Sequence, residues 1–148
     1  MDKSIFISNS PFFTQYLGRR VGEKLQEGSI IALIGELGCG KTCFTKGICM
    51  GLGIPTRYVN SPTFTFVNEY PGKLPTFHID LYRVNDITEG LEIGILDYLV
   101  KVKSGIAVIE WAEKIAFLLP NDYLEVQFYV LSLKKRKIVI SAFGDRFY

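Results

Sequence analysis

The sequence lacks the long apolar segments that mark membrane and secreted proteins. Its longest apolar stretches, 30–34 and 115–119, are far too short to span a bilayer. The N-terminus has no apolar secretory core, so we expect a cytoplasmic protein with no membrane role. Of the three cysteines, Cys39, Cys43 and Cys49, none belongs to a C-x-x-C pair or a zinc pattern. We expect reduced thiols that fill space in the interior.

The sequence also lacks a strong excess of charge of one sign. Lys and Arg number 17 and Asp and Glu number 15, so the formal net charge is +2. This balance argues against a protein that holds duplex nucleic acid on a basic face. Apolar residues make up 48% and charged residues 22%, which excludes a disordered tail. Without repeats or a Pro/Gly/Ser-rich linker, residues 1–148 are expected to form a single domain.

Apolar patterning predicts an α/β fold. Two continuous apolar runs, 30–34 and 106–109, are typical of strands buried on both faces. Ser10 and Pro11 predict the start of a helix whose apolar positions recur every four residues until Gly28. Helices are also expected over 41–51 and 85–102, the latter interrupted at Gly90 and Gly94, and further strands over 4–8, 64–70, 74–81, 123–132 and 137–142. Together these elements predict a three-layer α/β domain with a mixed, partly antiparallel sheet.

The segment 35–42 carries the strongest functional motif. Its sequence, Gly-Glu-Leu-Gly-Cys-Gly-Lys-Thr, satisfies G-x-x-x-x-G-K-[ST] between a predicted buried strand and a predicted helix. Backbone N–H groups in such a loop, together with the helix N-terminus, attract phosphate. Lys41 can reach the β- and γ-phosphates, and Thr42 can offer its hydroxyl to Mg²⁺. The sequence therefore predicts a P-loop NTPase domain, and GTP specificity has no support because no Asn-Lys-x-Asp segment is present.

Two acidic residues end predicted strands and are candidates for the chemistry beside the P-loop. Asp80 and Glu110 can each bind Mg²⁺ or orient the attacking water. His78 shares a strand face with Asp80, which leaves open a supporting role for the metal region or a purely structural one. Arg83 fits either a phosphate contact or a surface ion pair. The basic run 134–137 favours a hairpin turn and an edge strand blunted by charge over an RNA contact.

Taken together, these motifs resemble those of the TsaE (YjeE) family, the bacterial P-loop ATPases of tRNA threonylcarbamoyladenosine synthesis. The resemblance covers nearly the whole chain and rests on segments 35–42, Ser61-Pro-Thr-Phe64, His78-Ile-Asp-Leu-Tyr-Arg83, Glu110-Trp-Ala-Glu113 and 136–144. It implies an ATPase that uses ATP and Mg²⁺ and works with the TsaD–TsaB pair. That pair makes threonylcarbamoyladenosine next to the tRNA anticodon, and whether this chain contacts tRNA stays open.

The resemblance also implies roles for single residues. Thr42 and Glu110 would be the Mg²⁺ ligands, Asp80 would act near the γ-phosphate in hydrolysis, and 61–64 would be a switch-like loop. Cys43 stands where the family usually carries a second hydroxyl, and a thiol is a weaker hydrogen-bond donor. The expected catalytic residues are Lys41, Asp80 and Glu110, and the expected nucleotide contacts are Thr14, Glu36, Leu37, Gly38, Cys39, Gly40, Lys41, Thr42, Cys43 and Arg136.

Trp111 follows Glu110 and is expected at the rim of the nucleotide cleft, as an anchor for a partner. The alternative is ordinary packing under a helix over 113–119. Because no arginine finger is evident in the chain, we expect slow turnover of ATP by the isolated protein. The main alternative function is a nucleotide-dependent binding switch with incidental hydrolysis. A third alternative is a small-molecule kinase, which is less favoured because the sequence has no second Arg-rich stretch suited to a kinase lid.

Overall fold

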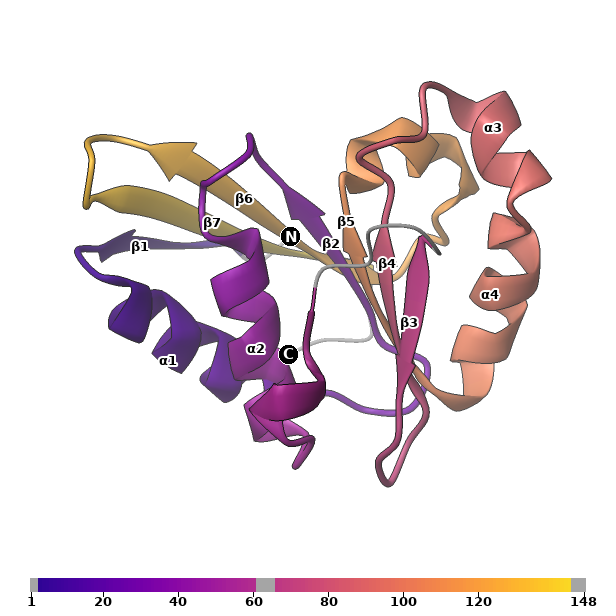
Figure 1. Ribbon diagram of the computed structural model, residues 1–148, viewed down its shortest axis with the longest axis horizontal. Helices are drawn as coiled ribbons and strands as arrows, with labels where there is room; N and C mark the ends of the chain where they lie inside the picture. Colours follow the sequence, from indigo (N-terminus) through magenta and orange to yellow (C-terminus); the bar gives the residue numbers. More distant parts are fainter. Residues whose placement is uncertain (1–2, 61–65, 145–148) are drawn as a thin grey trace.

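The computed structural model describes residues 3–60 and 66–144. These residues form a seven-stranded sheet in the order β1-β7-β6-β2-β5-β4-β3 (Figure 1). The strands are β1 (Lys3–Ser8), β2 (Ile30–Ile34), β3 (Val67–Tyr70), β4 (Thr76–Asp80), β5 (Ile106–Glu110), β6 (Tyr123–Val130) and β7 (Arg136–Phe143). The helices are α1 (Pro11–Gly22), α2 (Lys41–Gly51), α3 (Ile87–Glu92) and α4 (Ile95–Lys101), with 3₁₀ turns η1 (Thr56–Tyr58), η2 (Val102–Ser104) and η3 (Ala112–Leu118).

The sheet has a parallel centre and antiparallel flanks. Strand β2 pairs in parallel with both β5 and β6, and β4 pairs in parallel with β5. The pairs β1–β7, β6–β7 and β3–β4 are antiparallel. Every residue of β5 is buried, as expected of a strand covered on both faces. The predicted mixed, partly antiparallel sheet is therefore confirmed.

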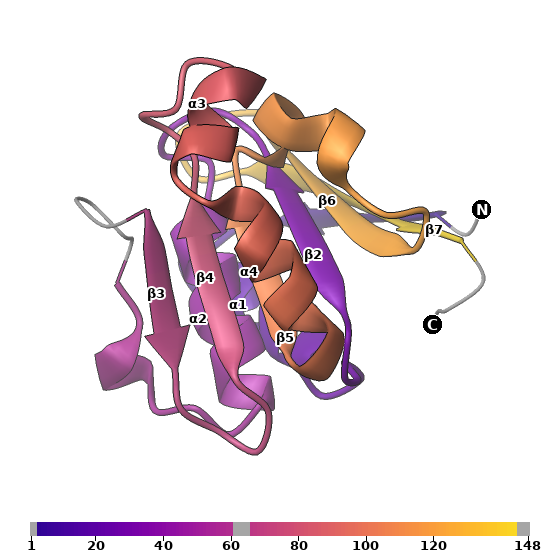
Figure 2. The same ribbon diagram turned by 90° about the vertical axis from the view of Figure 1, so that its right-hand side faces the viewer.

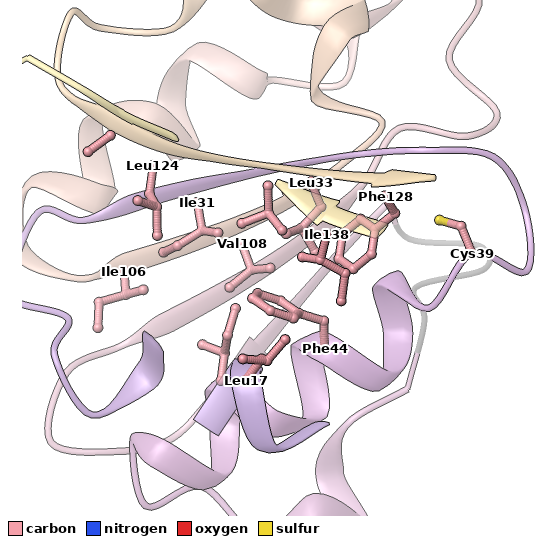
Figure 3. Close-up of a cluster of buried hydrophobic side chains, with 13 residues drawn as sticks. Leu17, Ile31, Leu33, Cys39, Phe44, Ile106, Val108, Leu124, Phe128 and Ile138 are labelled. Atoms are coloured by element: carbon pink, nitrogen blue, oxygen red, sulfur yellow. The ribbon is translucent and has the colours of Figure 1, made fainter. Parts of the chain in front are cut away.

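Helices cover both faces of the sheet and complete three layers. In Figure 2, α4 lies in front of the sheet while α1 and α2 lie behind it. Side chains of β2 alternate between two core clusters: Ile31 and Leu33 join the cluster under α1 and α2, and Ile30 joins the one under α4. Figure 3 shows Leu17 of α1 and Phe44 of α2 approaching the strands from the first of these sides. The predicted three-layer architecture is confirmed.

Two helix boundaries differ from the sequence prediction. Helix α1 ends at Gly22 rather than at Gly28, because the N–H groups of Lys24 and Leu25 bond to carbonyls only three residues back. Leu25 still packs against the core, so apolar spacing alone did not mark the end of the helix. The region after Asn85 breaks at Gly94, whose φ of 85° caps α4, whereas Gly90 lies inside α3.

Within the residues that the structure describes, no helix has the length and apolar character needed to cross a membrane.

Candidate functional site

The glycine-rich loop joins the carboxyl end of β2 to the start of α2. Gly38 and Gly40 have φ values of 74° and 109°, a region that side chains with a Cβ rarely adopt. At Gly35, an added Cβ would lie 2.7 Å from Cys39 Sγ and 3.1 Å from the carbonyl oxygen of Phe128. Gly40 is the N-cap of α2 and offers no capping side chain, so the first-turn N–H groups suit an anion.

Lys41 is held inside the loop although it carries a charge. Its side chain is buried, and Nζ donates a 2.5 Å hydrogen bond to the carbonyl oxygen of Gly35. Nζ also lies 3.7 Å from the centroid of the Trp111 ring. Burial lowers the pKa of Lys41, and the carboxylates of Glu110 and Asp80 are among the charges that oppose this shift. The ammonium group is therefore desolvated and close to both candidate acids.

The four residues expected to handle MgATP line one cavity. Lys41, Thr42, Asp80 and Glu110 surround a space of about 390 Å³, which Trp111 also borders. Asp80 and Glu110 are register partners on the parallel strands β4 and β5, so their carboxyl groups meet at one edge of the sheet. The hydroxyl of Thr42 and the carboxylate of Glu110 are oxygen donors, the type that Mg²⁺ takes together with phosphate oxygens. The residues present therefore fit the ion.

Asp80 combines a fixed orientation with partial burial. Its Oδ1 accepts a 2.9 Å hydrogen bond from the backbone N–H of Tyr82. Burial raises the pKa of Asp80 and the charge of Glu110 adds to the rise, while the N–H of Tyr82 and the charge of Lys41 act against it. A carboxylate with a raised pKa is better suited to accept a proton from water than an ordinary one.

His78 lies against Glu110, and the sequence left its role undecided. His78 Nε2 is 2.5 Å from Glu110 Oε2, and Nδ1 is 2.9 Å from the Tyr70 hydroxyl. His78 is fully buried, and Tyr70 and Glu110 are nearly so. Sequence reasoning missed Tyr70, because only the antiparallel pairing of β3 with β4 brings it to the histidine. Side-chain periodicity on a single strand carries no signal for this contact.

A second cavity on the other side of the glycine-rich loop collects the outlying nucleotide candidates. It measures about 520 Å³ and is lined by Thr14, Gly38, Gly40, Cys43 and Arg136, among others. Arg136 Nη2 donates to the carbonyl oxygen of Gly38 at 3.2 Å. The hydroxyl of Thr14 is 2.7 Å from that of Ser8 and the residue is buried, so a nucleotide would meet it only at the cavity wall.

The remaining loop residues divide between surface and interior. Glu36 and Leu37 are exposed, whereas the Cys39 side chain packs in the core under α1 and α2 and reaches a ligand only through its backbone. Cys43 donates its S–H to the carbonyl oxygen of Pro11 at 3.0 Å. Burial raises the pKa of Cys49 to about 12, so this thiol stays protonated. All three cysteines are unbridged, and Cys39 and Cys49 are buried as expected, whereas Cys43 is half-buried and lines both cavities.

Trp111 lies at the rim of the first cavity in a left-handed conformation, with φ of 60° and ψ of 38°. Its half-buried ring packs on the second core cluster and is 5.4 Å from the ring of Tyr82, centroid to centroid. The ring therefore borders the cavity and also packs on the core. The helix expected over 113–119 is the 3₁₀ segment η3, which Trp111 caps. The contact with Lys41 was not anticipated, since nothing in the sequence order brings position 41 near position 111.

Three other sequence candidates are Arg83, the basic run 134–137 and the loop 61–64. Arg83 is exposed beyond the end of β4. The run 134–137 includes the exposed turn between β6 and β7, where Leu131 N–H bonds to the carbonyl of Lys135, so the predicted hairpin turn is confirmed. The expected edge strand is wrong, because β7 pairs with both β1 and β6. Lys134 and Arg136 of this run line the second cavity. The expected switch-like loop 61–64 lies outside the described residues.

Comparison with known proteins identifies the family. The family model for "Threonylcarbamoyl adenosine biosynthesis protein TsaE" matches residues 8–138. A tRNA threonylcarbamoyladenosine biosynthesis protein TsaE from Treponema pallidum is 38% identical over 135 residues, covering 91% of this chain and 98% of that protein. The protein of the same name from Bacillus subtilis is 38% identical over 139 residues, covering 93% and 85%.

The fold comparison agrees with the sequence comparison. The crystal structure of YdiB from Bacillus subtilis superimposes with a TM-score of 0.79 at 29% identity, covering 99% of this chain and 89% of YdiB. The sequence resemblance noted above is thus confirmed at the level of both sequence and fold. This chain belongs to the TsaE family of proteins that serve tRNA threonylcarbamoyladenosine biosynthesis.

Proposed function

We propose that this chain binds MgATP, hydrolyses it slowly, and thereby supports a TsaD–TsaB complex that forms threonylcarbamoyladenosine in tRNA. The observation that carries the proposal is the gathering of Lys41, Thr42, Asp80 and Glu110 around one cavity at the end of the parallel strands. This group combines a phosphate-binding cation, a hydroxyl and two carboxylates, the set that phosphoryl transfer to water requires.

Binding comes from the loop and the start of α2. Backbone N–H groups of residues 38–42 surround the phosphates, and Lys41 exchanges its contact with the Gly35 carbonyl for phosphate oxygens. Thr42 and Glu110 would hold Mg²⁺, which neutralises charge that develops on the phosphates. Arg136 and the wall at Thr14 border the outer part of the nucleotide.

Hydrolysis is assigned to Asp80. Its carboxylate orients a water molecule so that the water oxygen attacks the γ-phosphorus while the bond to the β–γ bridging oxygen breaks. The water proton can pass to Asp80, whose pKa is raised by burial. Among the described residues, no arginine lines this cavity, and such a group can supply roughly 10³–10⁵ in rate. Turnover by the isolated chain is therefore expected to be slow.

The proposal is tested by nucleotide titration of Lys41→Ala at fixed salt. Loss of a charge-assisted contact to phosphate costs about 3 kcal/mol, so MgATP affinity should fall roughly a hundredfold. Lys46→Ala is a matched control, because Lys46 is on the same helix but does not line the cavity. Unchanged affinity in Lys41→Ala would contradict the phosphate-binding assignment.

Two further variants distinguish this ATPase function from the alternative, a nucleotide-dependent switch with incidental hydrolysis. Asp80→Ala should leave MgATP binding near normal and reduce the hydrolysis rate, as expected for a group needed mainly in the transition state. Glu110→Ala should weaken the Mg²⁺ dependence of binding, because one of the two proposed metal ligands is lost. If tRNA modification by TsaD and TsaB proceeds normally with Asp80→Ala, the switch is the better description. Pull-down of TsaD and TsaB with and without ATP tests the partnership itself.

A further inference from the structure

A buried chain of side chains runs from strand β3 to the candidate Mg²⁺ ligand. The hydroxyl of Tyr70 donates to the backbone carbonyl of Asn60 at 3.1 Å and also contacts His78 Nδ1 at 2.9 Å. His78 Nε2 contacts Glu110 Oε2 at 2.5 Å. The exposed fractions of Tyr70, His78 and Glu110 are 3%, 0% and 4%, so water does not compete for these bonds.

Counting hydrogens fixes the direction of each bond. The single hydroxyl hydrogen of Tyr70 is used on the Asn60 carbonyl, which can only accept. The contact with His78 therefore requires Nδ1–H to donate to the Tyr70 oxygen. The contact between His78 Nε2 and Glu110 Oε2 completes the chain. Both ring nitrogens of His78 are engaged, so the ring cannot rotate without breaking a bond at each end.

A fixed histidine ring fixes the carboxylate that it contacts. Glu110 lines the cavity with Lys41 and Thr42, so restraint on Oε2 also sets how the carboxylate is presented there. Stability alone does not explain the arrangement, because well-packed apolar residues often replace buried polar groups at no cost in stability. Partners of this kind, which orient a metal ligand from behind, typically change metal affinity or activity 10–100-fold when mutated.

We propose that His78 and Tyr70 are positioning residues, which hold the Glu110 carboxylate in the orientation that binds Mg²⁺ with the nucleotide. The proposal rests on the proposed function, since it requires Glu110 to be a Mg²⁺ ligand. Neither His78 nor Tyr70 lines the cavity that receives the phosphates. Both act through Glu110 only, so their loss should affect the Mg²⁺-dependent part of nucleotide binding and not the metal-free part.

Nuclear magnetic resonance tests the hydrogen-bond chain without metal, nucleotide or activity. His78 is the only histidine in the sequence, so ¹⁵N-histidine labelling gives the resonances of one imidazole ring. In the ligand-free protein we expect a slowly exchanging Nδ1–H and a strongly hydrogen-bonded Nε2. Tyr70→Phe should shift chiefly the Nδ1 signals, and Glu110→Gln chiefly the Nε2 signals. Spectra unchanged by both substitutions would overturn the chain.

Two substitutions at position 78 test positioning through function. A glutamine amide nitrogen can reach the place of Nε2 and donate to Glu110, whereas an asparagine amide nitrogen reaches only the place of Nδ1. We expect His78→Asn and Tyr70→Phe to weaken the Mg²⁺-dependent gain in ADP affinity about tenfold. His78→Gln should lose less than threefold. Calorimetric titration of ADP in the presence of Mg²⁺, and again in the presence of EDTA, measures the Mg²⁺-dependent and the metal-free parts of the affinity.

The controls separate failure of this inference from failure of the proposed function. Tyr98→Phe removes the same hydroxyl on the opposite face of the sheet, where Tyr98 packs on Phe77, and should change nothing in either titration. If Glu110→Ala keeps the full Mg²⁺ effect, the proposed function fails. If Glu110→Ala loses it but Tyr70→Phe and His78→Asn keep it, positioning fails. Tyr70→Phe conserves ring volume, so the test survives even if the position-78 variants do not fold.

Discussion

At the scale of single residues, the site places a buried cation where phosphate is expected. Lys41 donates to the Gly35 carbonyl and faces the Trp111 ring, and burying its charge is costly unless such contacts compensate. A desolvated cation–π contact contributes about 2 kcal/mol, which makes the Trp111 ring a substantial part of this support. Trp111 holds a left-handed backbone, anchored by its N–H bond to the Leu33 carbonyl at 3.1 Å. Nucleotide must therefore compete with Trp111 for the lysine.

This competition predicts a fluorescence signal, because Trp111 is the only tryptophan in the chain. Saturating MgADP should change the Trp111 emission as the ammonium leaves the ring. Lys41→Ala without nucleotide should already show altered emission, and MgADP should then change it little. If calorimetry shows MgADP bound to the unsubstituted protein while emission stays constant, Lys41 does not leave the ring on binding.

Removing the charge of Asp80 is expected to stabilise the folded protein to an extent that depends on pH. Its pKa lies above the ordinary value of 3.8, chiefly through burial, so ionised Asp80 disfavours the folded state wherever the pH exceeds that raised pKa. Asp80→Asn keeps an acceptor for the Tyr82 N–H and cannot ionise. Its Tm should exceed that of the unsubstituted protein at pH 7, and the difference should shrink as the pH falls through the raised pKa.

Thermal melts between pH 7 and 4.5 measure this difference. Glu92→Gln, which neutralises an exposed carboxylate on α3, is the control and should show no comparable gain. If the Tm gain of Asp80→Asn increased as the pH fell, the pKa of Asp80 would not be raised in the folded state. The expected result would mean that Asp80 is retained at a cost in stability.

At the scale of elements, α1 and α2 pack so closely that backbone meets backbone. A Cβ added at Gly47 would lie 2.0 Å from the carbonyl oxygen of Gln15, and one at Gly18 would lie 2.2 Å from that of Phe44. Neither oxygen is on a flexible side chain that could move away. This contact holds α2, whose first turn is expected to bind phosphate, against α1.

Gly47→Ala should therefore destabilise the protein, although alanine is the better helix former by about 1 kcal/mol. Overpacking commonly costs about 1–3 kcal/mol, and the short distance at Gly47 favours the upper end, so a net loss of up to about 2 kcal/mol is expected in urea unfolding. Gly90→Ala in α3 is the matched control, because its Cβ would face the Ile115 side chain at 3.2 Å. A Gly47→Ala protein at least as stable as the unsubstituted one would show that the helices separate without cost.

The boundaries and contacts of these elements show which parts of the fold and site could be predicted from the sequence. The strands 30–34 and 106–109 and the glycine-rich loop could be predicted, because each is specified by a short contiguous pattern. The end of α1 could not, since Leu25 reaches the core through a turn as well as it would through a helix. The contacts of Lys41 with Trp111 and of His78 with Tyr70 depend on which strands are neighbours. Local patterns carry no information on that order.

At the scale of the whole molecule, strand direction explains why the site forms at one edge. The strands β6, β2, β5 and β4 run in parallel, so their carboxyl ends lie together (Figure 1). The glycine-rich loop follows β2, and Asp80 and Glu110 end β4 and β5. Strand β7 returns antiparallel from β6, which starts it at the same edge and brings Arg136 to Gly38. The mixed sheet thus gathers residues from four separate strands.

The same edge carries Trp111, which is expected to meet a partner, and beside it Tyr82. Trp111 and Tyr82 lie side by side at the cavity rim, and Tyr82 is 48% exposed. Aromatic side chains in such positions are frequent anchors of interfaces. If TsaD–TsaB docks here, it would cover the cavity and could supply the arginine that the described lining lacks. ATP hydrolysis should then accelerate in the complex.

The expected outcome is slow ATP hydrolysis by the chain alone and faster hydrolysis with TsaD–TsaB, measured by phosphate release. Tyr82→Ala should lose at least tenfold of this stimulation, and Trp111→Ala should also lose it while retaining a cooperative melt. Tyr58→Ala is the matched control, because Tyr58 is a similarly exposed tyrosine, at 45%, that does not border the cavity. If Trp111→Ala unfolds the chain, the packing role of its ring dominates, and Tyr82→Ala still decides the interface. Full stimulation of both Tyr82→Ala and a folded Trp111→Ala would place the docking surface away from this rim.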